Sequence, residues 1–289
     1  MTASDSIPTA PRRISGTLDL RESEIYYEVT GTGPALVFAH GLGGNHLSWW
    51  QQIPHFCDRY SCVTFSHRGF PPSRSRTGTA GPREFAADLA ALVDHLELEE
   101  ISLVAQSMGG WTCLTYARER PERVRALIMS STTGTVDFGA IDHPDIQGLA
   151  RWNTQADAAK ADLASHGILA STGARMAREQ PTSYFLYREL YDLTPTVYKD
   201  HVRKTIRSAR NLGPRALAAI RTPTLFIIGE EDLIFPPGAA VATASLMPDA
   251  RLVRIPEAGH SVYFERPDQY NRVVDAFLAG HTGISPRIV

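Results

Sequence analysis

The sequence predicts an α/β protein: a mostly parallel eight-stranded sheet flanked by helices and interrupted by a helical cap. Three observations predict this fold class. Short runs of apolar and β-branched residues recur along the chain, helical patterns lie between several of them, and the strand-like runs stop between residues 134 and 212. Strands that alternate with helices are typical of a doubly wound sheet, and 289 residues suffice for such a domain with an insertion.

The predicted strands become more apolar after the first two, which lie close enough together to form a hairpin. The runs ALVFA, ISLVA and TLFII are apolar on both faces, as expected of central strands that helices cover on both sides. The eight runs span residues 16–20, 24–29, 35–39, 62–66, 101–105, 125–130, 224–228 and 251–255.

Two helical patterns are clear. One begins at Pro82, a residue favoured in the first turn of a helix, and continues with Phe85, Leu89 and Leu92 at helical spacing. The other begins near Pro267 and repeats apolar residues at the same period. These helices predict covering layers for the sheet.

We divide the chain into a tail, a core and a cap. Residues 1–12 are rich in Ser, Thr and Pro and predict a flexible N-terminal tail. The core is expected to comprise residues 13–133 and 213–289. Residues 134–212 contain no convincing strand and predict an inserted helical cap, with one helix opening near Thr194.

Composition excludes several classes of partner. Lys and Arg number 29 and Asp and Glu 31, so the net charge of -2 offers no strong field for nucleic acid or a membrane surface. Cys57, Cys62 and Cys113 form no CxxC pair, which favours thiols in a reducing compartment. With no apolar stretch of about 18 residues and no signal-peptide pattern, we expect a cytoplasmic protein that binds a small-molecule substrate. Assembly into a homo-oligomer is left open.

A serine follows one of the apolar strands directly. The strand at 101–105 leads into Gln106, Ser107, Met108 and Gly109, and a helical pattern follows. A serine at the apex of a strand–turn–helix exposes its hydroxyl, and the helix N-terminus places N–H donors beside it. Taken alone, this motif is as compatible with a structural turn as with a nucleophile.

A glycine-rich loop, HGLGG at 40–44, follows the strand at 35–39. Its backbone is free to turn the N–H of Leu42 toward the same space as the N–H of Met108, which together predict an oxyanion hole. A phosphate-binding loop is the alternative. The segment lacks both the GxGxxG spacing and the lysine of a GxxxxGK[ST] loop.

Two further strand ends carry an acid and a base. Asp232 follows the strand at 224–228, and His260 follows the strand at 251–255. Ligand sites of open α/β sheets lie at the carboxyl ends of the strands, so these residues are expected beside Ser107. Glu230 and Glu231 are alternatives to Asp232 that we interpret as surface charges.

These segments together resemble the α/β-hydrolase superfamily, and the likeness covers nearly the whole chain outside the tail and the cap. HGLGG resembles the oxyanion loop of that family, and AQSMGG resembles its GxSxG elbow, which implies Ser107 as nucleophile. GEEDLIFP implies Asp232 as the acid that orients the histidine, and EAGHS implies His260 as the base. The expected reaction passes through an acyl-enzyme. No metal or other cofactor is expected, and the chain lacks an HExxH zinc motif.

Two segments depart from the family pattern. Ala105 replaces the first glycine of the elbow. The loop that often reads DxRGxGxS is here SHRGFPPS, so Ser66 stands in place of Asp and Pro71 is added. The first departure leaves the elbow geometry attainable, whereas the second leaves the conformation of the loop open. His67 in this loop is interpreted as structural or facing solvent, with a place in the pocket as the alternative.

Aromatic residues are candidates for the walls of a substrate pocket. We select Trp49, Trp111, Trp152 and Tyr187, with core packing as the alternative for the tryptophans. The cap offers few obvious anchors for a charged substrate, which favours a mid-sized, mainly apolar or aromatic group.

The sequence favours hydrolysis of a carboxylic ester or a lactone. Cleavage of a carbon–carbon bond in a diketone-type compound by the same triad is the alternative, although HGLGGNH lacks the GPGA-like extension common in such relatives. The SMGG elbow also resembles those of perhydrolases and haloperoxidases. A small-molecule receptor on the same scaffold is the alternative outside the enzymes.

Overall fold

The computed structural model describes residues 10–283 and contains one mixed sheet with the strand order β1-β2-β4-β3-β6-β7-β8-β9. Strands β1, β2 and β4 pair antiparallel, and the pairs from β4 through β9 are parallel. The strands are β1 (Arg13–Asp19), β2 (Ser23–Thr30), β3 (Ala35–Ala39), β4 (Ser61–Phe65), β6 (Ile101–Gln106), β7 (Val124–Ser130), β8 (Thr224–Gly229) and β9 (Ala250–Ile255). Each of these strands overlaps one of the eight predicted runs, with bounds that differ by up to three residues, and together they confirm the predicted fold class. A further short strand, β5 (Arg74–Ser75), pairs with β2 and has no apolar pattern that predicts it.

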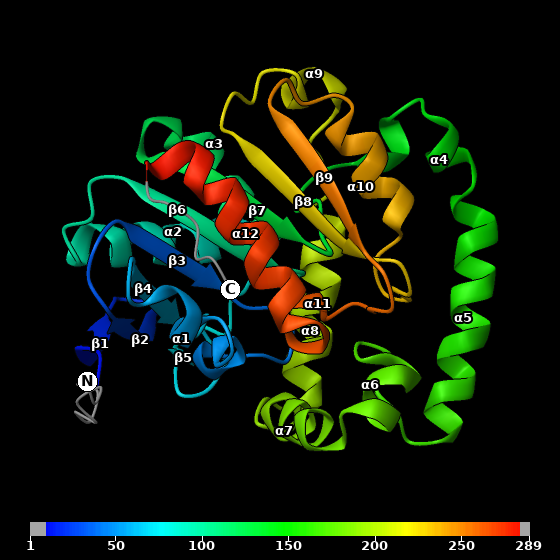
Figure 1. Cartoon of the computed structure of the whole chain (residues 1–289), viewed down its shortest axis with the longest axis horizontal. Helices are drawn as coiled ribbons and strands as arrows, with labels where there is room; N and C mark the ends of the chain where they lie inside the picture. Colours follow the sequence, from blue (N-terminus) through cyan, green and yellow to red (C-terminus); the bar gives the residue numbers. More distant parts are fainter. Residues whose placement is uncertain (1–9, 284–289) are drawn as a thin grey trace, which may run out of the picture.

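The sheet lies between two layers of helices, and each layer has its own apolar core. Neighbouring residues of β3 alternate between them: Val37 contacts one core, and Leu36 and Phe38 contact the other. In Figure 1, α12 lies in front of the sheet and α3 behind it. The helices of the core are η1 (His46–Trp49), α1 (Ile53–Phe56), α2 (Pro82–His95), α3 (Gly109–Glu119), η2 (Pro121–Arg123), α9 (Pro214–Leu217), α10 (Pro237–Ala244), α11 (Val262–Glu265) and α12 (Pro267–Thr282).

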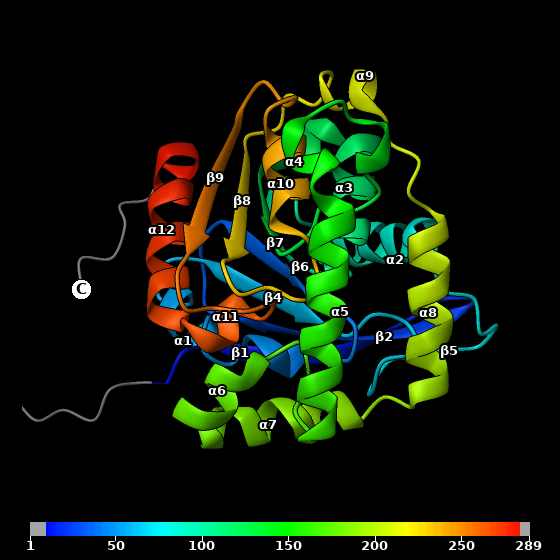
Figure 2. The same ribbon diagram turned by 90° about the vertical axis from the view of Figure 1, so that its right-hand side faces the viewer.

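The segment between β7 and β8 is helical. Figure 2 shows α5 and α8 upright, with α6 and α7 below them. A parallel bridge joins Val136 to Leu212, where the segment leaves the core and returns to it, which supports the cap bounds that we propose, 134–212. The helices are η3 (Phe138–Ala140), α4 (Pro144–Gln147), α5 (Leu149–Ser165), α6 (Gly173–Glu179), α7 (Pro181–Asp192) and α8 (Thr196–Ser208).

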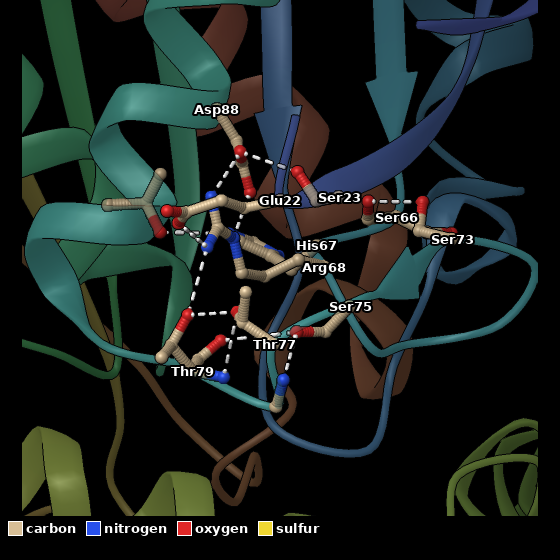
Figure 3. Close-up of polar contacts among 12 residues, drawn as sticks. Glu22, Ser23, Ser66, His67, Arg68, Ser73, Ser75, Thr77, Thr79 and Asp88 are labelled. Atoms are coloured by element: carbon tan, nitrogen blue, oxygen red, sulfur yellow. Dashed lines mark hydrogen bonds and ion pairs between the residues drawn. The ribbon is translucent and has the colours of Figure 1, made fainter. Parts of the chain in front are cut away.

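A buried ion pair holds the loop whose conformation the sequence leaves open. Figure 3 shows the guanidinium of Arg68 against the carboxylate of Asp88 on α2, with Nε–Oδ2 and Nη2–Oδ1 distances of 2.6 Å. The hydroxyl of Ser23 also donates to Asp88, at 2.9 Å. The cap contacts this loop because Tyr198 of α8 donates its hydroxyl hydrogen to the carbonyl of Arg68, at 2.8 Å. The loop therefore links the sheet to the cap.

The remaining expectations concern the tail, the cysteines and membrane association. Residues 1–9 of the predicted tail lie outside the described residues. All three cysteines are buried, and burial raises the pKa of the Cys62 and Cys113 thiols above the usual range. Between residues 10 and 283, no helix is both long and apolar enough to span a bilayer.

Candidate active site

The carboxyl ends of three parallel strands bring Ser107, Asp232 and His260 together. The Oγ of Ser107 lies 2.9 Å from Nε2 of His260. On the other side of the ring, Nδ1 of His260 lies 2.9 Å from Oδ2 of Asp232. Asp232 and His260 are 2% and 4% exposed, so water competes little for these hydrogen bonds. The chain of contacts has the order needed to move a proton away from a serine hydroxyl.

The turn that carries Ser107 is a tight strand-to-helix turn. Ser107 adopts a φ of +48°, a left-handed conformation that is strained for a residue with a side chain. Gly109 allows the turn to approach β3, because a Cβ there would lie 2.1 Å from the carbonyl oxygen of Ala39. Ala105, the departure from the family pattern, is fully buried in β6, and its methyl group is accommodated.

The two predicted oxyanion donors lie close to this turn. Within residues 10–283, the backbone N–H groups of Leu42 and Met108 have no hydrogen-bond acceptor in the protein. Gly41 brings the loop against the elbow, because a Cβ there would lie 1.9 Å from Oε1 of Gln106 and 3.3 Å from Cβ of Ser107. Two unpaired amides beside a serine hydroxyl suit the stabilisation of a developing oxyanion.

His40 holds the oxyanion loop and stays neutral. Its Nδ1 lies 2.8 Å from the carbonyl oxygen of Gly41, and its Nε2 accepts the backbone N–H of His67 at 2.9 Å. The proton therefore resides on Nδ1. Burial lowers the pKa of His40 to about 3, so the ring brings no charge to the site.

Backbone donors fix the carboxylate of Asp232. Its Oδ1 accepts the N–H groups of Ile234 and Phe235 at 2.8 and 2.9 Å, which leaves Oδ2 directed at the histidine. Glu231 instead pairs with Arg175 of the cap at 2.6 Å. The geometry favours Asp232 over this neighbour as the partner of the histidine. No group of three or more His, Cys, Asp and Glu side chains in the described part of the chain is arranged to hold a metal ion.

Glu265 contributes to the site although the sequence analysis did not select it. Its Oε2 accepts the N–H of Gly259 at 2.7 Å, and its Oε1 accepts the N–H of Ser261 at 2.9 Å. Burial raises the pKa of Glu265 to about 8, while the two backbone donors act in the opposite direction. The available signal was an acidic residue at the end of the apolar run VYFE.

A cavity of about 350 Å³ opens on the serine and the histidine. Two of the selected aromatic residues, Trp111 and Tyr187, line it. The other walls include Leu42, Ser107, Ser131, Leu169, Tyr191, Ile206, Ile234, Phe235 and His260.

The other selected aromatic residues do not line this cavity. Trp49 is completely buried and packs between Phe38 and Tyr263, with ring centroids 5.2 and 4.6 Å away, because its helix turns it into the core. Trp152 lies on α5 and is not among the residues that line the cavity. His67 is buried behind the site, where its Nε2 lies 2.8 Å from Oγ1 of Thr112, so its position fits the structural interpretation.

The cavity also carries basic side chains, which the sequence analysis did not anticipate. Lys160 of α5 and Arg203, Arg207 and Arg210 in or just after α8 contribute to the lining. The spacing of the three arginines, four and then three residues, corresponds to one side of a helix, although α8 ends at Ser208 and Arg210 follows it. This spacing is the feature of the sequence that indicates a shared basic surface, although the solvent-exposed face of a helix has the same pattern.

Known proteins share this fold. A family model described as the alpha/beta hydrolase fold matches residues 34–267. A Mycobacterium tuberculosis protein with the provisional name non-heme bromoperoxidase BpoC is 26% identical over 268 residues, which cover 88% of this chain and 97% of that protein.

Two solved structures are similar over almost the whole chain. Est816, described as an N-acyl homoserine lactone degrading enzyme, has a TM-score of 0.75 and 25% identity, covering 91% of this chain and 100% of that one. A thermophilic esterase from Thermogutta terrifontis has a TM-score of 0.72 and 25% identity, covering 94% of this chain and 99% of that one. From the family match and these relatives, we conclude that the chain belongs to the α/β-hydrolase family of enzymes.

Proposed function

We propose that the protein hydrolyses a carboxylic ester or a lactone of a mid-sized small molecule through an acyl-enzyme on Ser107. The observation that carries the proposal is the continuous set of hydrogen bonds from Ser107 through His260 to Asp232, which ends at a cavity. The similarity to an esterase and to a lactone-degrading enzyme supports the same reaction class.

The proposed cycle uses one proton shuttle twice. His260 takes the hydroxyl proton of Ser107 through Nε2 as Oγ attacks the carbonyl carbon, and Asp232 stabilises the imidazolium that forms. The N–H groups of Leu42 and Met108 stabilise the tetrahedral oxyanion. When the intermediate collapses, the carbon–oxygen bond of the ester breaks, and His260 returns the proton to the leaving alcohol.

Water completes the cycle. With the acyl group on Ser107, His260 removes a proton from a water molecule that attacks the same carbonyl carbon. The second tetrahedral intermediate collapses, the proton returns to the serine oxygen, and the carboxylic acid leaves. The net reaction consumes one water molecule.

The cavity supports a substrate with a partly apolar body. A volume of about 350 Å³ lies within the usual range for small-molecule sites, roughly 300–1,000 Å³. Apolar and aromatic side chains near the serine, among them Trp111, Ile206 and Phe235, suit an acyl or alcohol group that is transferred out of water.

A substrate panel tests the proposal. We expect turnover of nitrophenyl esters or lactones, labelling of the wild type by a fluorophosphonate probe, and loss of both in Ser107→Ala. Ser208→Ala, an exposed position at the end of α8, serves as the matched control. Turnover that persists in Ser107→Ala contradicts the role of this serine. If the protein cleaves diketones but neither esters nor lactones, carbon–carbon bond cleavage becomes the favoured function. If a ligand raises the melting temperature and no substrate is turned over, a receptor becomes the favoured function.

A further inference from the structure

Four basic side chains share the cavity with the serine and the histidine. Arg203 and Arg207 project from α8, Arg210 follows the end of that helix, and Lys160 lies on α5. Figure 2 shows these two helices. Among the residues that the structure describes, no Asp or Glu lines the cavity. This local excess of positive charge contrasts with a net charge of -2 for the whole chain.

The four cations differ in how their charge is compensated. Lys160 pairs with Asp157 on its own helix at 2.6 Å, and Arg203 pairs with Asp200 on α8. In contrast, no ion pair within 4.0 Å joins Arg207 or Arg210 to a carboxylate of residues 10–283, and Asp137 acts on Arg210 only at longer range. The last two cations are therefore available to a negatively charged ligand.

Arg210 occupies an unusual position for a charge without an ion-pair partner, because the carboxylate of Asp137 acts on it only from beyond 4.0 Å. Its guanidinium lies over the rings of Trp111 and Phe138, 4.8 and 4.4 Å from their centroids. Nη1 donates to the carbonyl of Val136 at 3.1 Å, while Nε and Nη2 have no acceptor among the described side chains and backbone. Burial lowers the pKa of Arg210 to about 10, so it remains charged at neutral pH. A partly buried charge without a directly paired counter-charge is costly, and an anion in the cavity offsets that cost.

We propose that the substrate carries a carboxylate and that Arg207 and Arg210 bind it while Ser107 attacks the ester or lactone carbonyl at the other end of the same molecule. The inference rests on the proposed function and adds a substrate class to it. Guanidinium groups suit this role because their planar donors match the two oxygens of a carboxylate. The apolar side chain of Ile206, directly before Arg207 on the chain, also lines the cavity and suits the body of the molecule.

A purely structural role for Arg210 is the alternative. It links Val136, at the start of the cap, to Trp111 on α3, whose Nε1 donates to the carbonyl of Ile206 at 2.8 Å. Under that alternative, changing Arg207 or Arg210 alters stability and leaves the preference between charged and neutral substrates unchanged. The two accounts therefore differ in how these substitutions change the ratio of kcat/KM for a charged substrate to kcat/KM for a neutral one.

Matched esters measure that ratio. Mono-4-nitrophenyl glutarate and 4-nitrophenyl pentanoate have the same leaving group and acyl length, but only the first carries a carboxylate. The pair 4-acetoxybenzoate and methyl 4-acetoxybenzoate places the charge on the alcohol side instead. We expect kcat/KM to favour the charged member of at least one pair by about tenfold or more, and the preference to decline with added salt because charges attract less when screened.

Single substitutions assign the preference to the arginines. Arg207→Gln is expected to lower the preference about tenfold, equivalent to about 1.4 kcal/mol, mainly through KM. Lys204→Gln, on the same helix but outside the cavity, is the charge-matched control and is expected to keep the preference. Arg210→Met retains an apolar side chain over the rings of Trp111 and Phe138, and its activity on the neutral ester reports whether it is folded.

The outcomes separate this inference from the proposed function. Equal or lower activity on the charged member of both pairs, or a preference that survives in both Arg207→Gln and Arg210→Met, overturns the inference and leaves ester hydrolysis intact. If no ester is hydrolysed, the binding of mono-4-nitrophenyl glutarate to Ser107→Ala is compared with that of the neutral ester by calorimetry. Tighter binding of the charged ester, lost in Ser107→Ala/Arg207→Gln, supports the carboxylate site even where the proposed reaction fails.

Discussion

Glu265 accepts a hydrogen bond from the backbone on each side of His260, through the N–H groups of Gly259 and Ser261. The histidine is thus held by a second carboxyl group, which contacts the backbone on either side of it. Because α11 is a single turn that begins just after the histidine, Glu265 folds back onto the loop that precedes its own helix. The position of the proposed base depends on this contact as well as on Asp232.

Glu265→Gln is expected to lower both activity and stability. A glutamine replaces one carboxyl oxygen with an NH2 group that cannot accept a hydrogen bond, so one buried N–H loses its partner, at a cost of about 1–3 kcal/mol. The exposed neighbour Glu257→Gln is the control. Urea unfolding and kcat at pH 5 measure both effects. A variant with wild-type kcat contradicts a positioning role for Glu265.

The pH dependence of stability should also change in Glu265→Gln. Because burial raises the pKa of Glu265 from 4.5 to about 8 in the folded protein, its ionisation opposes folding. This group therefore contributes stability below pH 4.5 that is lost as the pH rises toward 8. The variant lacks this loss, so the stability difference between wild type and variant should shrink from pH 5 to pH 9. If the stability difference between wild type and variant instead grows from pH 5 to pH 9, the raised pKa of Glu265 does not explain the pH dependence.

Asp232→Asn tests the orientation of the histidine. An amide at this position favours the wrong tautomer of His260, and we expect kcat to fall roughly 10⁴-fold with little change in the fold. Glu231→Gln, one residue away and paired with the cap, should retain activity within about threefold, since its contact with Arg175 is exposed. Equal losses in the two variants argue against Asp232 as the acid of the triad.

Asp88→Asn tests the ion pair that holds the loop after β4. Both members are buried, Arg68 at 4% and Asp88 at 2% exposure, so the substitution leaves the guanidinium with only the more distant, exposed carboxylate of Glu22 as an ion-pair partner, at 3.6 Å. We expect a loss of about 3–5 kcal/mol in the free energy of unfolding. Asp94→Asn removes the exposed pair with Arg120 and should cost about 0–1 kcal/mol. Urea denaturation compares the two, and similar losses contradict the special role of the buried pair.

Thiol reagents test the burial of the cysteines. Because the thiolate is the reactive form and burial raises the pKa of Cys62 and Cys113, the native protein should react slowly with dithionitrobenzoate at pH 8. All three cysteines of the chain should react promptly in guanidinium chloride. A fast stoichiometric reaction of the native protein shows that a cysteine is exposed.

The strands and the approach of the three proposed catalytic residues were predictable because both depend on local pattern. Continuous apolar runs indicate central strands, and the carboxyl ends of parallel strands share one edge of the sheet. Residues directly after such strands, Ser107 among them, meet at that edge without any knowledge of the side-chain packing.

Contacts made across the chain were less accessible to prediction. Trp49 follows the oxyanion loop closely enough to suggest a pocket residue, but the orientation of η1 sends it into the core. Arg207 and Arg210 lie in a segment whose charge pattern also fits a solvated helix, and only the placement of α8 over the serine shows that they share its cavity. Glu265 likewise reaches the N–H groups of Gly259 and Ser261 only because α11 is a single helical turn.

The bridge between Val136 and Leu212 has a consequence for how selectivity evolves in such a molecule. The chain departs from the sheet and rejoins it at adjacent points, so recombination at these points exchanges the intervening helices as one module. Ser107, Asp232 and His260 lie outside that module, whereas all four basic side chains of the cavity lie within it. Exchange of this segment between homologues is therefore expected to change which substrates bind, while the residues that carry out bond cleavage stay in place.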